Sequence, residues 1–340
     1  MATINKTVKG ADPKVDFGAI VAPLEGYLKE LDQFLKDQVE LLEPEVQSQV
    51  AYILNHSGKR LRPILVALSG WDSGLKSQNE LIRLGAILEL VHLATLVHDD
   101  ILDEASIRHG HPTAANKYGK DSAVLIGDIL FAHALCLASD FETTEVCRAV
   151  ALATSRVCTG EISQTYSRQQ LNFDRAHYYR VIELKTAELF RLACEMGAKV
   201  AGKSEATCNA LRTYGIHLGC AYQIFDDVVD LFVSEAKAGK TLGTDLQSGK
   251  FTLPLLVLIE SLPEKERLEW IESYQSGDPQ AVALLVGYLS EYPVLASVKE
   301  AFNESIVKAR SALNAVNSSE PVAKELFALI DFLCAQFEAI

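Results

Sequence analysis

Apolar residues recur at helical spacing over most of this chain. In residues 24–43, leucines and a valine stand three or four positions apart, which is typical of an amphipathic helix with a polar outer face. The stretches 78–103 and 122–139 are apolar nearly all round, as expected of helices in the centre of a large bundle. The helical pattern continues over 144–166, 174–201, 205–233, 252–262 and 320–339.

Strand patterns are nearly absent, because no β-branched run alternates with period two between turn residues. Probable turns, rich in Gly, Pro, Ser and Asp, are short, and neither a linker nor a repeat of solenoid length divides the chain. The pattern therefore predicts one all-α domain over residues 1–340. We expect the first 20 residues to form a poorly ordered N-terminal segment.

Composition narrows the class of protein. Hydrophobic residues make up 49% and charged residues 23%, as in ordinary folded proteins, and the net charge of −13 argues against a nucleic-acid partner. The same charge would also disfavour a small anionic ligand. The seven cysteines form no C-x-x-C pair, which predicts reduced thiols in a cytosolic protein rather than a zinc site or disulfides.

No targeting or membrane segment is expected. The N-terminus lacks both the apolar core of a signal peptide and the arginines of a transit peptide. The most apolar stretch, 81–97, is interrupted by Arg83, Glu89 and His92, so it falls short of an uninterrupted span of about 20 residues. We therefore expect a cytoplasmic chain of the size of an enzyme that is not a transmembrane protein.

Two aspartate motifs with the same spacing carry the first chemical signal. Asp99, Asp100 and Asp103 end one apolar helix; Asp226, Asp227 and Asp230 end another. Positions i and i+4 share a helix face, so Asp99 and Asp103 project together while Asp100 points aside. Paired carboxylates suit Mg²⁺, which also binds phosphate oxygens. One such motif alone could be a solvated helix end, but two facing each other would hold several divalent ions and a diphosphate.

Basic residues stand near both motifs and suggest a second anion site. Each alone would be an ordinary surface charge, but together they describe a site for two phosphorylated ligands, one bound through metal and one through cations. These residues are Lys59, Arg60 and Arg62 before an apolar helix, Arg108 after the first aspartates, Lys185 beside Thr186, and Lys240 and Lys250 in a loop.

The order of these motifs resembles that of the trans-isoprenyl diphosphate synthases, the polyprenyl synthetases. The matching strings are GKRLRP, HxxxxxHDDxxD, KT, QxFDDxxD and GKxxGxDLxxGKxTLP, spread over roughly residues 55–255. The resemblance implies a single all-α bundle of about ten or more helices around a deep central cavity, in a homodimer. It implies head-to-tail joining of isopentenyl diphosphate to an allylic diphosphate, with release of pyrophosphate and a polyprenyl product of C20 or longer.

The resemblance also assigns roles to individual residues. Asp99, Asp103 and Asp226 look like ligands of three Mg²⁺ ions, with Asp227 and Asp230 supporting the second motif. Further roles follow from motif position: Arg108, Lys185, Lys240 and Lys250 around the allylic diphosphate; Thr186 and Gln223 stabilising the carbocation; Lys59, Arg62 and His92 holding isopentenyl diphosphate. With six aspartates facing three divalent cations, the site would be close to neutral, so the net charge of −13 misleads for small anions.

One departure from the family pattern concerns the isopentenyl site. Where the family reads Arg-Arg-Gly after the first aspartates, this chain reads Arg108-His109-Gly110. A histidine near its usual pKa of about 6.5 is mostly neutral at pH 7. We hypothesise that isopentenyl diphosphate binds more weakly here and more tightly at lower pH, unless His109 merely hydrogen-bonds within its loop.

Product length is expected to depend on residues that precede Asp99 on its helix. Thr95, Ala94 and Val91 lie four, five and eight positions before it, and none is bulky. In short-chain relatives an aromatic residue blocks the tail there, so this chain resembles the longer-chain branch, with C30–C50 products favoured. The alternative is that a side chain from another helix, or from a dimer partner, closes the tunnel.

Two other functions remain open from the sequence. A class I terpene cyclase also ionises a prenyl diphosphate, but such cyclases typically replace the second aspartate motif and lack GKRLRP. A non-catalytic subunit that tunes a partner synthase usually loses one aspartate motif, whereas both are present here. Both alternatives are therefore disfavoured.

Overall fold

The fold was analysed in a computed structural model of the chain, which describes residues 16–70, 78–233, 245, 248–278, 280–289, 291–316 and 321–340. It confirms the all-α prediction. The elements are α1 (Phe17–Val21), η2 (Ala22–Leu24), α2 (Glu25–Glu40), α3 (Pro44–Asn55), α4 (Leu61–Gly70), α5 (Gln78–Leu102), β1 (Ile107–Arg108), β2 (His111–Pro112), α6 (Ala114–Tyr118), α7 (Lys120–Ser139), α8 (Thr144–Gln170), α9 (Arg175–Ile182), η3 (Glu183–Ala187), α10 (Glu188–Val200), α11 (Glu205–Phe232), α14 (Leu253–Ser261), α15 (Glu264–Gln275), α16 (Gln280–Tyr288), α17 (Val294–Asn314) and α18 (Pro321–Glu338).

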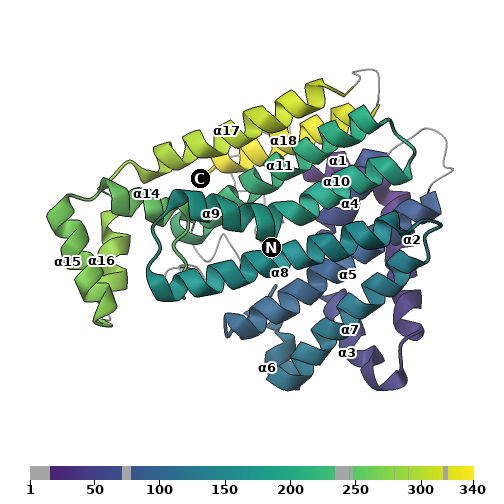
Figure 1. Cartoon of the computed structure of the whole chain (residues 1–340), viewed down its shortest axis with the longest axis horizontal. Helices are drawn as coiled ribbons and strands as arrows, with labels where there is room; N and C mark the ends of the chain where they lie inside the picture. Colours follow the sequence, from purple (N-terminus) through teal and green to yellow (C-terminus); the bar gives the residue numbers. More distant parts are fainter. Residues whose placement is uncertain are drawn as a thin grey trace.

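The long helices pack side by side into a bundle (Figure 1). Helix α5 packs against α7 on one side and α4 on the other, and α4 in turn packs against α10, followed by α11 and α17. Helices α15 and α16 form a hairpin that projects from one end of the bundle (Figure 1). The apolar side chains of the central helices form one continuous core. The aspartate motifs lie at the C-terminal ends of α5 and α11, on the walls of a cavity inside the bundle.

The predicted helix over 174–201 is broken by a π-helical turn. Element η3 separates α9 from α10 and carries both Lys185 and Thr186. Glycines allow two neighbouring helices to approach this turn closely. A Cβ atom at Gly160 of α8 would lie 2.8 Å from the Lys185 backbone nitrogen, and one at Gly219 of α11 would lie 2.6 Å from Ala187 Cα. Glycine is therefore required on both sides of the turn that presents the two site residues.

A tight β-hairpin follows α5. Strands β1 and β2 pair antiparallel through Arg108 and His111, with two residues between them. Those residues, His109 and Gly110, have φ angles of 51° and 79°. Positive φ at both central positions is the geometry that two-residue hairpins favour, and Gly110 adopts it without steric cost.

Two sequence expectations need correction. Residues 17–20, inside the segment expected to be poorly ordered, belong to α1, and Ile20 is buried; residues 1–15 lie outside the described part. Among the described residues, α5 and α7 are long and apolar enough to cross a membrane, although charges in 81–97 seemed to disqualify that stretch. The most apolar window of α5 is 78% buried inside the bundle, whereas that of α7 is 39% buried. Core packing accounts for the composition of α5.

Candidate active site

The central cavity has a volume of about 1060 Å³. Its polar part is lined by both aspartate motifs and by basic side chains from η3, β1 and the segment before α14. Its remaining wall includes apolar side chains from α5, α7, α8 and α10. The predicted site residues on its wall are Arg62, His92, Asp99, Asp103, Arg108, His109, Lys185, Thr186, Gln223, Asp226, Asp227, Asp230 and Lys250.

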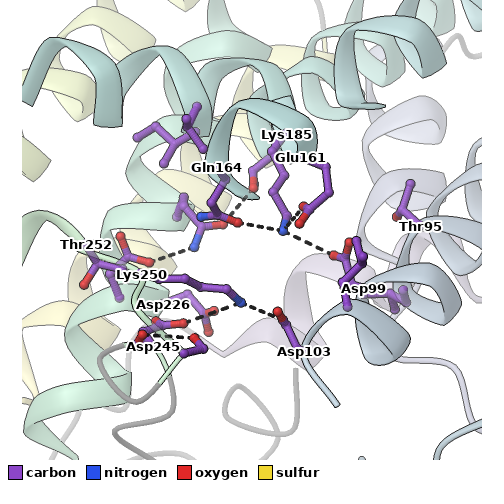
Figure 2. A pocket seen from close by; sticks show the side chains of 18 of the residues that line it. Thr95, Asp99, Asp103, Glu161, Gln164, Lys185, Asp226, Asp245, Lys250 and Thr252 are labelled. Atoms are coloured by element: carbon purple, nitrogen blue, oxygen red, sulfur yellow. Dashed lines mark hydrogen bonds and ion pairs between the residues drawn. The ribbon is translucent and has the colours of Figure 1, made fainter. Parts of the chain in front are cut away.

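The first aspartate motif faces lysines from across the cavity (Figure 2). Lys185 Nζ lies 3.5 Å from Asp99 Oδ2, and Lys250 Nζ lies 2.6 Å from Asp103 Oδ2. Burial raises the pKa of Asp99 to about 6, although Lys185 opposes this shift. Burial would also raise the pKa of Asp103, but Lys250 and Arg168 outweigh it and hold that pKa below its usual value. The two carboxylates of one face therefore differ in their partners and in the direction of their pKa shifts.

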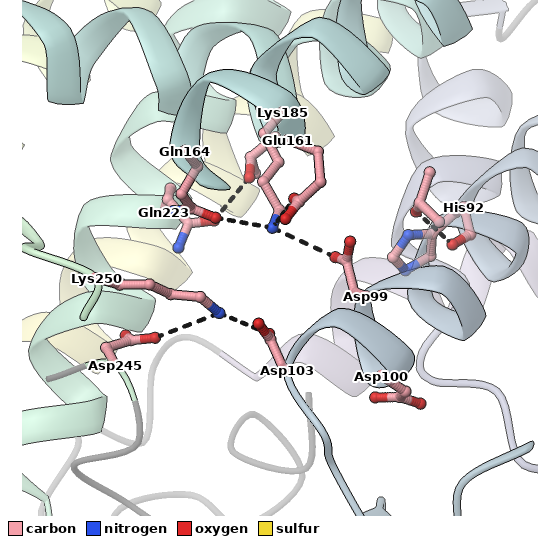
Figure 3. A network of polar contacts seen from close by, with 12 residues as sticks. His92, Asp99, Asp100, Asp103, Glu161, Gln164, Lys185, Gln223, Asp245 and Lys250 are labelled. Carbon is pink, nitrogen blue, oxygen red and sulfur yellow. Dashed lines mark hydrogen bonds and ion pairs between the residues drawn. The ribbon is translucent and has the colours of Figure 1, made fainter. Parts of the chain in front are cut away.

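Asp100 points away from this pair, as the helical spacing predicts (Figure 3). Its Oδ1 accepts hydrogen bonds from Arg108 Nε at 2.8 Å and Nη2 at 2.7 Å. Burial raises the pKa of Asp100, and Arg108 counteracts part of that rise. The ion pair holds β1 against the end of α5. Arg108 therefore lines the cavity while its guanidinium is bound to Asp100.

The second aspartate motif has a different environment. Asp227 and Asp230 are only 3% and 4% exposed, whereas Asp226 is half-buried. Asp227 accepts hydrogen bonds from Tyr178 at 2.6 Å and from Gln223 Nε2 at 2.8 Å, and burial raises its pKa well above the usual range. Asp227 is therefore held by neutral donors and not by lysines.

Thr186 and Gln223 form a polar pair from facing helices. The Thr186 hydroxyl donates to Gln223 Oε1 at 2.7 Å, and the Gln223 amide donates onward to Asp227. These two hydrogen bonds fix the orientation of the Gln223 amide, because its oxygen accepts from Thr186 while its nitrogen donates to the Asp227 carboxylate. Both side chains line the cavity and present oxygen atoms without a free nucleophilic charge.

Buried cations and histidines make up another part of the wall. Arg62 is 5% exposed, lies 5.3 Å from the Phe190 ring centroid, and has its pKa lowered to about 10 by burial. His92 is 6% exposed, and burial lowers its pKa well below the usual value. His109 Nδ1 lies 3.1 Å from the carbonyl oxygen of His56 at the end of α3, so its hydrogen-bond partner lies outside its own loop. At pH 7 Arg62 is charged, whereas both histidines are neutral.

One predicted site residue does not line the cavity, and another falls outside the described residues. Lys59 does not line it: the Nζ atom lies 4.8 Å from the Phe17 ring centroid on α1, and burial lowers the pKa of Lys59 to about 8. Lys240 lies outside the described residues.

Helix α8 supplies site residues that the sequence reasoning missed. Glu161 forms an ion pair with Lys185, Gln164 Oε1 accepts from Lys185 Nζ at 3.0 Å, and Arg168 Nη2 lies 2.9 Å from Asp103 Oδ1. Asp245 also lines the cavity, 4.0 Å from Lys250 Nζ. The spacing of an acid, an amide and an arginine at i, i+3 and i+7 on one helix face was a signal that could have identified α8.

The structure also revises the predicted floor of the tunnel. Thr95 lines the cavity, but Ala94 and Val91 are 0% and 1% exposed and do not line it. The apolar wall includes Leu96 of α5, Phe131 of α7 and Val157 of α8. Side chains from other helices therefore line the same cavity as Thr95, and which side chain closes the tunnel stays a prediction.

The carboxylates of the cavity are suited to binding divalent metal ions. Carboxylate oxygens from α5 and α11 line one cavity and have the ligand chemistry that Mg²⁺ requires. Among the described residues, no three acidic, histidine or cysteine side chains converge on a single ion position. These carboxylates fit ions that bind one or two carboxylates each and complete their coordination with water and phosphate oxygens. Mg²⁺ usually binds to proteins in this way.

Known proteins are similar to this chain in sequence. The polyprenyl synthetase family model matches residues 43–289. The chain is 35% identical to the all-trans-nonaprenyl-diphosphate synthase of Rhodobacter capsulatus, over 73% of this chain and 76% of that protein. It is 34% identical to the octaprenyl diphosphate synthase of Haemophilus influenzae, over 79% and 82% respectively.

Solved structures share the fold. A polyprenyl synthase from Caulobacter crescentus, solved with calcium and isoprenyl diphosphate, superposes with a TM-score of 0.85 at 28% identity, covering 95% of this chain and 99% of that one. The sequence family, the bundle and the paired aspartate motifs thus agree. The chain belongs to the polyprenyl synthetase family and is a prenyltransferase of isoprenoid biosynthesis.

Proposed function

We propose that this chain condenses isopentenyl diphosphate head-to-tail with an allylic diphosphate and releases a polyprenyl diphosphate of C20 or longer and pyrophosphate. The observation that carries the proposal is the division of one cavity into a polar part with two aspartate motifs and an apolar part. A diphosphate fits the first part and a growing hydrocarbon tail fits the second. The names of the octaprenyl and nonaprenyl synthase relatives favour a long product.

For the metal, we propose three Mg²⁺ ions held by Asp99, Asp103 and Asp226, with Asp227 and Asp230 behind them. When bound, the metal would act as a Lewis acid toward the leaving diphosphate. Lys185 and Lys250 already lie against the first motif, so they can move from carboxylate to phosphate oxygens without crossing the cavity. Arg108, held by Asp100, supplies a further cation nearby. Lys240 is assigned to the allylic diphosphate by its motif position alone.

Ionisation breaks the allylic C–O bond, and the diphosphate leaves with both electrons. We assign stabilisation of the resulting carbocation to Thr186 and Gln223, whose oxygens offer dipoles in a largely buried site. The isopentenyl double bond then attacks, forming the new C–C bond. The proton lost from the product passes to the released pyrophosphate, so no side-chain base is assigned.

The second diphosphate is assigned to Arg62, His92 and His109. Arg62 is a buried cation whose Nε has no hydrogen-bond partner among the described residues, and such a donor stabilises a bound anion strongly. Lys59 is half-buried against Phe17, so its role in this site requires a change of side-chain position. The neutral His109 supplies less charge than an arginine would.

We extend the proposal to the whole chain and its assembly. Residues 1–340 form one polyprenyl synthetase domain, because the fold match covers 95% of the chain. The chain forms a homodimer through the neighbouring helices α7 and α8, which expose Leu125, Leu152 and Ile162 at 62%, 55% and 56%. It acts in the cytoplasm. Light scattering at low micromolar concentration tests the assembly, and a monomer there would contradict it.

Incorporation of radiolabelled isopentenyl diphosphate tests the reaction. The chain is incubated with Mg²⁺ and each of dimethylallyl, geranyl and farnesyl diphosphate, and the products are dephosphorylated and chromatographed. Linear polyprenols of C20 or longer are expected. Cyclised hydrocarbon would indicate a terpene cyclase, and no incorporation with any starter would indicate a non-catalytic subunit.

A further inference from the structure

Arg60 is a basic residue of the GKRLRP string to which the proposed function assigns no role. It does not line the cavity, although Arg62, two positions later, does. Arg60 immediately precedes α4, and its carbonyl oxygen accepts from the Ile64 amide at 2.9 Å, the hydrogen bond that begins that helix. Its φ angle is 57°, in the left-handed region that residues with a side chain rarely adopt. Such a backbone conformation persists only where surrounding contacts hold it.

The Arg60 guanidinium makes contacts of this kind with three other helices. Nη1 donates to Glu89 Oε1 of α5 at 2.9 Å, and Nε donates to Asp32 Oδ1 of α2 at 3.3 Å. Nη2 donates to the carbonyl oxygen of Leu54 of α3 at 3.5 Å. The Glu89 side chain is 3% exposed, whereas that of Asp32 is 52% exposed. Because solvated ion pairs contribute little and a buried one is costly to break, Glu89 is the partner that fixes Arg60.

This ion pair joins the two helices that carry Arg62 and His92, both assigned to the second diphosphate. Arg62 lies in the first turn of α4, with its guanidinium 5.3 Å from the Phe190 ring centroid. His92 stands three positions after Glu89, so the two share a face of α5. The backbone of Arg60 sets the direction in which α4 begins. A displaced Arg60 would therefore move Arg62 relative to His92.

We propose that Arg60 and Glu89 are positioning residues for the isopentenyl diphosphate site, and that their ion pair places Arg62 where it meets the diphosphate. The inference rests on the proposed function, since it concerns a substrate assigned there. Neither residue touches the substrate in this arrangement. The competing explanation is that Arg60 binds the diphosphate directly as one more cation.

Glu89 separates the two explanations because they predict opposite effects of removing its charge. Burial lowers the pKa of Arg62, and the charge of Glu89 opposes this shift, so Glu89 also acts on Arg62 electrostatically. Without Glu89 the site would be more positive and Arg60 would be free to bind an anion. If charge alone mattered, the diphosphate would bind more tightly. If position matters, it binds more weakly.

The test measures kcat and KM for both substrates in Glu89→Gln and Glu89→Asp. The first variant removes the charge, and the second keeps the charge but shortens the side chain. KM for isopentenyl diphosphate is expected to rise roughly tenfold in each, because a small displacement of a binding group is costly. KM for the allylic diphosphate and kcat should stay within about twofold of the wild type, since the other diphosphate site is unchanged.

Asp32→Asn is the matched control, because Asp32 contacts the same guanidinium from the exposed face of α2. Its KM values should stay within about twofold of the wild type. Arg60→Met should raise KM for isopentenyl diphosphate as much as Glu89→Gln does. The double variant with both substitutions should be no worse than either single variant, because both act through one contact.

The outcomes separate this inference from the function on which it rests. A wild-type chain that makes no linear polyprenol would overturn the proposed function. An unchanged or lower KM for isopentenyl diphosphate in active Glu89 variants would overturn the inference and leave the function intact. An equal rise of KM for both substrates, or in Asp32→Asn, would also overturn it, because general loosening would then explain the effect. Glu89→Asp keeps the test valid if Glu89→Gln does not fold.

Discussion

The two aspartate motifs share one spacing and have opposite surroundings. At the end of α5, Asp99 and Asp103 face lysines across the cavity, and Arg108 holds Asp100 on the far side of the helix. At the end of α11, Asp227 is buried among the neutral donors Tyr178 and Gln223. Identical spacing therefore does not mean identical chemistry, because the neighbouring helices decide which carboxylate is charged and accessible.

This difference predicts unequal roles. The α5 motif presents two carboxylates whose lysine partners can be exchanged for other cations. In the α11 motif all three aspartates line the cavity, but Asp226 is half-buried whereas Asp227 and Asp230 are buried. We therefore expect the α5 motif to tolerate substitution least, and Asp227 to act mainly by orienting Gln223.

The largest effect is expected for Asp103→Asn. The substitution keeps the shape of the side chain but removes the negative charge that pairs with Lys250 and Arg168. We therefore expect kcat/KM to fall by roughly 10²–10³-fold. Steady-state incorporation of labelled isopentenyl diphosphate measures it. The matched control is Asp37→Asn on the exposed face of α2, which should retain wild-type activity. A loss below tenfold in Asp103→Asn would contradict a direct role.

Asp227→Asn should have a smaller effect. An asparagine can still accept from Tyr178, and supporting residues of this kind usually cost about 10–100-fold in activity or metal affinity. The measurement is kcat/KM together with the Mg²⁺ concentration that gives half-maximal rate. If Asp227→Asn is as damaging as Asp103→Asn, the two motifs are equivalent and the comparison fails.

Ala94→Phe should shorten the main product while leaving the aspartate motifs intact. Ala94 is fully buried, and an added ring cannot enter a close-packed layer without displacing neighbours, so it should push toward the cavity. Chromatography of dephosphorylated products measures the length, and thermal unfolding reports the cost of overpacking. A folded, active variant with an unchanged product spectrum would remove Ala94 from the control of length.

The smallest effect is expected for His109→Arg. Burial lowers the pKa of His109, and the charges of Arg108 and His111 lower it further. The hydrogen bond to His56 opposes this shift. His92 of α5 also interacts electrostatically with His109. The wild-type histidine is therefore neutral at pH 7 and gains charge only as the pH falls below 6.5. The variant should lower KM for isopentenyl diphosphate a few-fold at pH 7–8. Equal KM values from pH 6 to 8 would refute the hypothesis.

Sequence alone predicted the polar half of the site better than the apolar half. Asp99 and Asp103 were identifiable because i, i+4 spacing places them on a common helix face. The second copy of the motif identified α11 as the other helix of the site. Phe131, Glu161 and Gln164 were missed because their place depends on the register between helices, which no local pattern encodes. Lys59 does not line the cavity although it stands close to Arg62 in sequence, so its role in binding isopentenyl diphosphate stays a prediction.

The most direct test of the account is whether both motifs hold one diphosphate together with metal. Isothermal titration of inorganic pyrophosphate into the chain, with and without Mg²⁺, measures this without any chemical step. We predict a binding event that requires Mg²⁺ and that is lost in both Asp103→Asn and Asp226→Asn, but not in Asp37→Asn. Absence of any Mg²⁺-dependent binding, or its persistence in either of the two motif variants, would contradict the account.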